Sequence, residues 1–137
     1  MTSYESLLSM TVAFTLGIPG FESCRRFVLL QAPEFEPALC LKGLDGSMPM
    51  FMVVDPRRIA PEYDPVLSGP ELERLGAVDA SMCAWLAIIG FGEGPPVVNL
   101  RAPIVINPET MRGIQAVPAD SPWAVDAPWP SGAACSS

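Results

Sequence analysis

A mainly β fold, a small β-barrel-like single domain with one or two short helices, is what this sequence predicts. The 137 residues include 16 prolines and 11 glycines, spread along the chain so that they divide it into short pieces. Pieces of about five to eight residues suit strands better than helices. Half of the residues (50%) are hydrophobic, which is enough for one continuous core. We therefore expect residues 1–130 to form one domain and residues 131–137 to form a disordered C-terminal tail.

The expected strands are segments rich in apolar and β-branched residues. The first alternates Val12, Phe14 and Leu16 with smaller residues, the period of a half-buried strand. The segment from Met82 to Phe91 is nearly all apolar, so we expect both of its faces to be buried. In chain order the expected strands are Met10–Leu16, Arg25–Ala32, Met50–Asp55, Met82–Phe91, Val97–Ala102, Ile104–Asn107 and Arg112–Val117.

One segment, SGPELERLG from Ser68 to Gly76, has the pattern of a helix. Ser68 suits the N-cap, Pro70 the first turn, and Gly76 the C-terminal end. Glu71 and Glu73 lie near the positive end of the helix dipole. At about two turns the helix is too short to be stable alone, so it must pack on the sheet.

Charge and cysteine spacing restrict the function and the compartment. Acidic residues outnumber basic ones 15 to 8, for a net charge of −7, which argues against direct binding to nucleic acid or to an anionic membrane. The four cysteines are far apart and lack the spacing of a zinc site, which favours free thiols in a reducing cytosol: Cys24, Cys40, Cys83 and Cys135. Without a signal peptide or a long apolar stretch, we expect a cytoplasmic protein.

The residues give little support for catalysis or for a cofactor. The chain has no histidine, the usual general base of hydrolases, and only one lysine, Lys42. Asp55, Glu62 and Asp64 lack the pattern of a calcium loop, and turn acids that bond their own backbone are the preferred interpretation. The glycine-rich Gly90–Pro96 segment lacks the Gly-Lys-Ser/Thr ending of a phosphate loop, so a hairpin connection is favoured. We expect no metal and no cofactor, although a flavin-binding barrel stays open as an alternative.

Three blocks of the sequence, in order, resemble the flagellar assembly factor FliW family. The blocks are LGIPGFESCRRFVLL (Leu16 to Leu30), FMVVDPRRIAPEYDPVLSGPELERLG (Phe51 to Gly76) and VNLRAPIVINPETMRGIQAV (Val98 to Val117). One block alone would be weak evidence, but the ordered set covers most of the chain. The resemblance implies a barrel-like fold without a catalytic role.

The resemblance also implies two cytoplasmic protein partners. These are flagellin and CsrA, an RNA-binding translational regulator that represses the flagellin message. A FliW-like protein released from flagellin would bind CsrA and relieve that repression. We also expect a monomer when no partner is bound. The charge of −7 suggests a further hypothesis, namely that Glu71, Glu73 and other acids repel RNA phosphates near the CsrA site.

Candidate partner contacts come from the third block. Pro103 suits a strand edge or a break between two strands. Ile104 and Ile106 share one face, which is either barrel core or an exposed apolar patch for a partner. Asn107 and Pro108 are expected to form the corner between the last two strands.

Two further candidates are an aromatic and a basic residue. Tyr63 lies between Glu62 and Asp64, and an aromatic among polar residues is a reasonable interface candidate. Arg101 either binds a carboxylate of the partner or is merely solvated. Trp123 and Trp129 either fold back on the barrel or stay exposed for a partner. The alternative functions are a small barrel enzyme or flavin-binding protein, and a general export chaperone.

Overall fold

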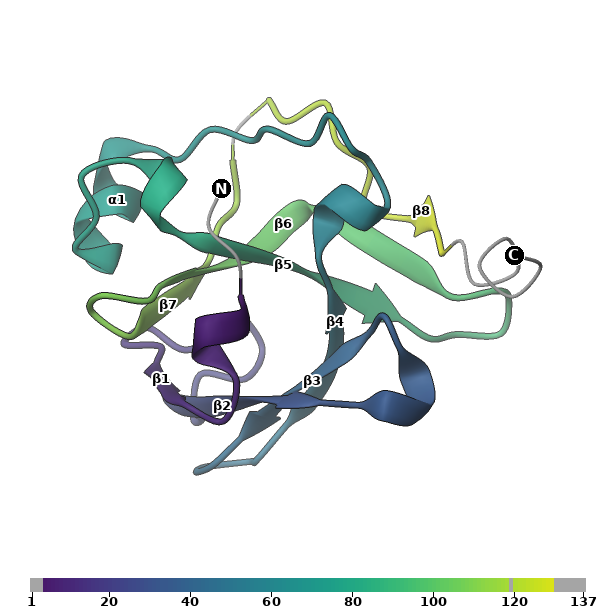
Figure 1. Ribbon diagram of the computed structural model, residues 1–137, viewed down its shortest axis with the longest axis horizontal. Coiled ribbons are helices and arrows are strands. Elements are labelled where there is room, and N and C mark those ends of the chain that lie inside the picture. The colour runs from purple at the N-terminus through teal and green to yellow at the C-terminus, as the bar shows by residue number, and fades with distance from the viewer. Residues whose placement is uncertain (1–3, 119, 130–137) are drawn as a thin grey trace.

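The computed structural model describes residues 4–118 and 120–129, and these form a closed β-barrel with one short α-helix (Figure 1). The strands are β1 (Thr11–Ala13), β2 (Arg26–Gln31), β3 (Leu39–Gly43), β4 (Met50–Val54), β5 (Ala84–Gly90), β6 (Val97–Asn107), β7 (Arg112–Gln115) and β8 (Ala127–Pro128). The helix is α1 (Gly69–Leu75), and the 3-10 turns are η1 (Glu5–Leu7), η2 (Pro33–Phe35), η3 (Pro56–Arg58) and η4 (Ala80–Met82). The predicted tail, 131–137, lies outside the described residues.

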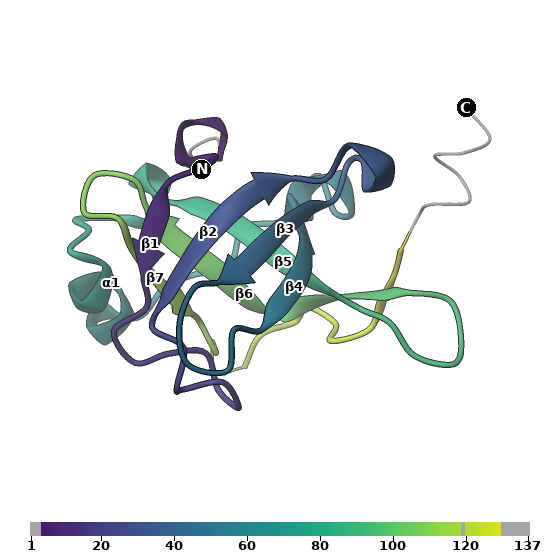
Figure 2. The ribbon, with the colours of Figure 1, turned by 90° about the horizontal axis from the view of Figure 1, so that it is seen from below.

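Antiparallel pairing runs through the order β1, β2, β3, β4, β5, β6, β7, and a single parallel pair closes the barrel. That pair is Ala13 with Arg112, between β1 and β7. β8 adds to β6 at Val97 and Val98, near the tip of the β5–β6 hairpin. Figure 2 shows this hairpin projecting beyond the rest of the barrel. The predicted barrel-like fold is confirmed.

Most predicted strands match the observed ones, with three differences. Neither β3 nor the two-residue β8 was predicted. The two strands expected on either side of Pro103 are one continuous strand, β6, so the expected break at this proline is wrong. The Gly90–Pro96 segment forms the β5–β6 hairpin connection, as predicted.

The helix confirms its predicted cap in detail. The Ser68 hydroxyl accepts a hydrogen bond from the Glu71 amide at 3.2 Å, and the Glu71 carboxylate accepts one from the Ser68 amide at 2.9 Å. This reciprocal pair is a capping box. Gly76 ends the helix with a φ of 65°, a left-handed conformation that favours glycine.

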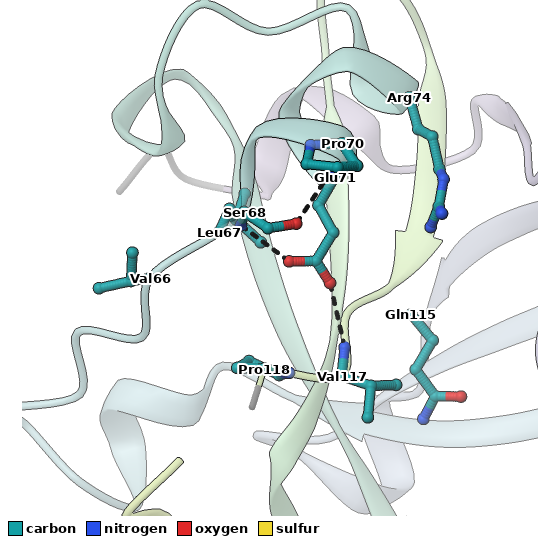
Figure 3. A pocket seen from close by; sticks show the side chains of 9 residues that line it. All are labelled: Val66, Leu67, Ser68, Pro70, Glu71, Arg74, Gln115, Val117 and Pro118. Atoms are coloured by element: carbon teal, nitrogen blue, oxygen red, sulfur yellow. Dashed lines mark hydrogen bonds between the residues drawn. The ribbon is translucent and has the colours of Figure 1, made fainter. Parts of the chain in front are cut away.

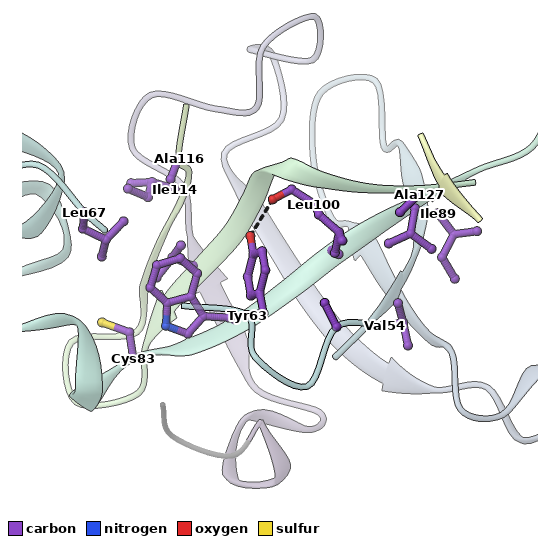
Figure 4. Close-up of a cluster of buried hydrophobic side chains, with 14 of the residues drawn as sticks. Val54, Tyr63, Leu67, Cys83, Ile89, Leu100, Ile114, Ala116 and Ala127 are labelled. Carbon is purple, nitrogen blue, oxygen red and sulfur yellow. Dashed lines mark hydrogen bonds between the residues drawn. The ribbon is translucent and has the colours of Figure 1, made fainter. Parts of the chain in front are cut away.

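The core has two layers, separated by the sheet. Inside the barrel, Phe14 and Phe27 meet edge to face at 5.0 Å, together with inward residues of β5 and β6. Gly113 permits this packing, because a Cβ there would lie 2.6 Å from the Phe14 ring. The outer layer covers β5, β6 and β7 with side chains from α1, the segment before it and the C-terminal segment (Figure 4). The two layers explain why the segment from Met82 to Phe91 is almost wholly apolar.

The described cysteines are free. Cys24 and Cys83 are buried and Cys40 is half-buried. Burial raises the pKa of the Cys83 thiol, and that of Cys40, above the ordinary value. Free thiols were predicted for these three; Cys135 lies outside the described residues.

Candidate functional site

The third sequence block forms a strand with a sharp irregularity in its middle. The pairing of β5 with β6 shifts from Leu86 opposite Ile104 to Ile88 opposite Asn99, so β6 carries extra residues at this point. The side chain of Asn99 holds the bulge, because its Oδ1 accepts hydrogen bonds from the amides of Arg101 and Ala102 at 3.0 and 3.1 Å. Asn99 had not been singled out from the sequence, although an Asn before a Pro-containing strand is a turn-forming residue that could have indicated it.

The backbone groups freed by the bulge are bonded by two side chains and one backbone carbonyl of other segments. The buried Tyr63 hydroxyl donates to the Leu100 carbonyl at 2.6 Å. The Gln115 side-chain amide donates to the Ala102 carbonyl at 3.1 Å. The Leu100 amide donates to the Ala124 carbonyl at 2.9 Å. Buried polar groups need such partners, so these contacts allow the strand to bend inside the core.

Tyr63 is therefore a core residue, and the expectation that its side chain lies on the surface is wrong. It is fully buried, and desolvation raises the pKa of its hydroxyl. Its neighbours Glu62 and Asp64 point into solvent, so their polarity says nothing about the residue between them. Its ring lies 4.9 Å from that of Trp123 and 6.4 Å from that of Trp85.

The isoleucines of the block lie inside the barrel. Ile104 and Ile106 are both fully buried, which confirms the core interpretation and leaves no exposed apolar patch at these positions. Pro103 is also buried. Pro103 lies at the end of the β6–β7 pairing, where its missing N–H costs the ladder little. Its carbonyl accepts the last hydrogen bond of that pairing, from the Ala116 amide at 2.8 Å.

Asn107 forms the predicted corner, from a buried position. Its Nδ2 donates to the Leu75 carbonyl at 2.9 Å, and its Oδ1 accepts from the Glu109 amide at 3.0 Å. The Thr110 hydroxyl also donates to the Leu75 carbonyl, at 2.7 Å. The corner thus satisfies a carbonyl at the end of α1 and fixes the helix to the β6–β7 turn.

Arg101 is the one predicted contact residue with an exposed side chain. Its Nε donates to the Trp123 carbonyl at 2.9 Å, which holds the C-terminal segment over the bulge. Trp123 and Trp129 are partly buried against the outer core layer, which confirms that both fold back on the barrel. Arg101 thus has a structural partner within the chain, while its guanidinium stays accessible.

A groove of about 560 Å³ lies beside this block, between α1 and the end of β7 (Figure 3). Its lining residues are Val66, Leu67, Ser68, Pro70, Glu71, Arg74, Gln115, Val117 and Pro118. The Glu71 carboxylate, which caps the helix, also accepts a hydrogen bond from the Val117 amide at 3.1 Å. The sequence had suggested Glu71 as a charge near the helix dipole and as one of the acids that repel RNA, and nothing in it had pointed to a groove.

Within the described residues, 4–118 and 120–129, there is no group of three histidine, cysteine, aspartate or glutamate residues that could hold a metal ion. Asp55 behaves as a turn acid, since its carboxylate accepts from the Arg57 amide at 3.0 Å and caps η3. No helix in this part of the chain is long and apolar enough to cross a membrane.

The comparisons with known proteins agree with one another. The model of the FliW protein family matches residues 3–129. A flagellar assembly factor FliW of Thermotoga neapolitana is 36% identical over 107 residues, covering 76% of this chain and 72% of its own length. That of Syntrophus aciditrophicus is also 36% identical over 107 residues, covering 77% and 68%.

The same resemblance holds for the fold. A crystal structure of the flagellar assembly factor FliW superimposes with a TM-score of 0.78 and 28% identity, over 86% of this chain and 84% of that one. The family match spans both the barrel and the outer layer, and it includes the bulged strand, the capped helix and the Trp123 segment. This chain belongs to the FliW family.

Proposed function

We propose that the chain is a cytoplasmic flagellar assembly factor with two alternative protein partners. In this proposal it binds flagellin before export. When flagellin is consumed, the free protein binds CsrA and prevents it from repressing translation of the flagellin message. The observation that carries the proposal is the family match over residues 3–129, to relatives named flagellar assembly factor.

The charge of the chain supports the CsrA half of the proposal. At −7, the protein would place negative potential beside the RNA site of a bound RNA-binding protein and so disfavour the phosphate backbone. Glu71 is a poor residue with which to test this, because its carboxylate bonds Ser68 and Val117 within the chain. The exposed Glu73 on the same helix is a better choice, combined with other exposed acids such as Glu62 and Asp64.

The decisive experiment is a competition between the two partners. Tagged protein is incubated with purified CsrA, and purified flagellin is then added in increasing amounts. We expect CsrA to be retained first and displaced as flagellin binds, and free protein to release CsrA from a flagellin-message RNA. An acidic protein of similar size and charge serves as the control for nonspecific attraction. Binding of neither partner at low salt would refute the proposal.

The same purified protein distinguishes the proposed function from the two alternatives, a cofactor-binding barrel and a general export chaperone. A visible absorbance band of a stoichiometric flavin in the purified protein would indicate a cofactor-binding barrel. Equal retention of unrelated unfolded chains and of flagellin would indicate a general export chaperone. Our proposal requires selective retention of flagellin. Loss of CsrA inhibition at high salt, together with weaker inhibition by the Glu62, Asp64 and Glu73 neutralised variant, would support the electrostatic contribution.

A further inference from the structure

β7 has a strand neighbour along its whole length on one side only. It pairs with β6 from Arg112 to Gln115. On its other side β1 pairs with it only at Arg112. No other strand of the described residues lies beside β7, so its C-terminal half is a short open edge of the barrel.

The pairing determines which backbone groups face this edge. The bond from the Ala116 amide to the Pro103 carbonyl shows that Ala116, and by alternation Ile114, direct their peptide groups towards β6. Gln115 and Val117 then direct theirs away from β6. The bond from the Val117 amide to the Glu71 carboxylate confirms this direction independently. The N–H and C=O groups of Gln115 therefore face outwards, where no strand of the described chain pairs with them.

The open edge borders the groove of Figure 3, which Gln115 and Val117 help to line. Val66 and Val117 are 78% and 65% exposed, so the groove presents uncovered apolar surface as well as backbone groups. Pro118 follows directly and limits an added strand to a few residues. An extended peptide matches these features, because only a backbone offers donors and acceptors at strand spacing.

One charged side chain of the lining, Arg74, is available to a carboxylate of a partner. Arg74 is exposed, lines the groove and forms no ion pair with any described residue. The carboxylate of Glu71 already accepts hydrogen bonds from the backbone of Ser68 and Val117. Asp64 and Asp120 line a neighbouring hollow beyond Val66 and Pro118. The lining thus carries one negative and one positive charge, and Arg74 is the one whose charged group has no bonded partner among the described residues.

We propose that this groove binds an extended, acidic segment of a partner protein as an added strand beside β7. The backbone of the segment bonds the N–H and C=O of Gln115, a carboxylate of the segment bonds the Arg74 guanidinium, and an apolar side chain covers Val66 and Val117. The inference rests on the proposed function for the identity of the partner, but the chemistry of docking follows from the edge and the groove alone.

A peptide titration tests the docking chemistry without any assumed partner. The probe is the acetylated, amidated pentapeptide Thr-Val-Asp-Val-Thr, added to ¹⁵N-labelled full-length protein and followed by NMR. At saturation we expect hydrogen exchange of the Gln115 amide to slow by about tenfold or more, because that amide becomes bonded. The Val117 amide, already bonded to Glu71, should change little. The same peptide with N-methyl groups on the two amide nitrogens that flank the Asp Cα, its own and that of the following Val, should not bind. A peptide with Lys in place of the Asp should bind more weakly, by about fivefold or more.

Other outcomes would overturn the inference. Equal binding of the N-methylated peptide, or shifts confined to another face, would show that β7 does not accept a strand. An equal Arg74 response to succinate alone would show an anion site rather than a peptide site. Concentration-dependent dimerisation that protects Gln115 without any peptide would assign the edge to a second copy of this chain.

Two variants extend the test to the partners of the proposed function. Arg74→Glu reverses the charge at the groove, and Lys42→Glu makes the same change at an exposed position on β3 as the matched control. Gln115→Pro removes the outward N–H and keeps the backbone bonds to β6, and is the second variant in case Arg74→Glu fails to fold. Because it also removes the side-chain bond to the Ala102 carbonyl, Gln115→Ala, which loses that bond but keeps the N–H, is its control. For flagellin or CsrA we expect at least about a tenfold loss of affinity with either groove variant and little change with Lys42→Glu.

These results distinguish the two proposals. If the wild type and the groove variants bind a partner equally well, and the partner does not slow hydrogen exchange of the Gln115 amide, the groove inference fails while the proposed function stands. If wild-type protein binds neither flagellin nor CsrA, the proposed function fails and the peptide titration alone decides the inference.

Discussion

The hydroxyl of Tyr63 donates a 2.6 Å hydrogen bond to the carbonyl of Leu100, a residue 37 positions further along the chain (Figure 4). Tyr63 belongs to the segment that covers the barrel, and Leu100 lies in the bulge of β6. The bond therefore joins the covering layer to the barrel at the point where the strand ladder is interrupted. A carbonyl released from a ladder inside a core needs such a donor.

Tyr63→Phe should destabilise the protein while keeping its fold. The substitution leaves the ring in place but removes the donor, so the buried Leu100 carbonyl loses its partner. We expect the free energy of unfolding to fall by about 1–3 kcal/mol. Urea denaturation followed by circular dichroism measures it, with Tyr4→Phe as the control because Tyr4 is the other tyrosine of the chain and is only half-buried. Equal stability of Tyr63→Phe and wild type would contradict the assigned role.

Ile104→Glu should prevent folding rather than block a partner site. Ile104 is fully buried inside the barrel, and a carboxylate there would have no partner for its charge. The milder Ile104→Ala should remain folded with a loss of about 2–5 kcal/mol, and it should still bind any partner under conditions where it is folded. Val66→Glu, an exposed position, is the control for folding. A folded Ile104→Glu protein would show that the position is not core.

The periodic segments could be predicted from the sequence because burial on one or both faces leaves a pattern of side chains. β3 was missed although Leu39 and Leu41 alternate with Cys40 and Lys42, a pattern that the charged Lys42 and the terminal Gly43 obscure. Closure of the barrel depends on one pair, Ala13 with Arg112, and no local pattern encodes such a contact.

The site was harder to predict than the fold because local polarity does not report burial. Tyr63 has charged neighbours yet is buried, since it follows a turn and its ring packs beneath Trp123. Asn107 is polar but buried, because the turn and the helix end both need its side chain. The groove joins α1 to the end of β7, and residues so distant in sequence share no motif.

Asp45→Asn should lower the stability at neutral pH but not in strong acid. Hydrogen bonds from the Arg25 amide and then from the Arg26 side chain hold the pKa of Asp45 at about 2, below its ordinary 3.8. Because the folded-state pKa is the lower one, the stabilisation is present above pH 3.8 and is lost as the pH falls towards 2. The difference in Tm between wild type and variant should therefore be constant from pH 7 to about pH 4 and then shrink.

Thermal scans at several pH values measure this difference. Glu73→Gln, an exposed helix position, is the matched control for removing one negative charge. A difference that stays constant down to pH 2 would mean that ionisation of Asp45 does not contribute to stability. A difference that grows in acid would have the wrong sign for a depressed pKa.

Trp123→Ala should weaken the attachment of the C-terminal segment to the barrel. The Trp123 ring packs on Tyr63 at 4.9 Å, and its carbonyl accepts the bond from Arg101 Nε. Because the side chain is only partly buried, the loss should be about 1–3 kcal/mol, less than for a fully buried aromatic. Circular dichroism in urea is the suitable measurement, since fluorescence changes with the tryptophan count. Trp129→Ala is the matched control. The Trp129 ring contacts no other aromatic ring of the described residues, so its loss should be smaller. A larger loss for Trp129→Ala, or less than about 0.5 kcal/mol for Trp123→Ala, would mean that the Tyr63–Trp123 contact does not hold the covering layer in place.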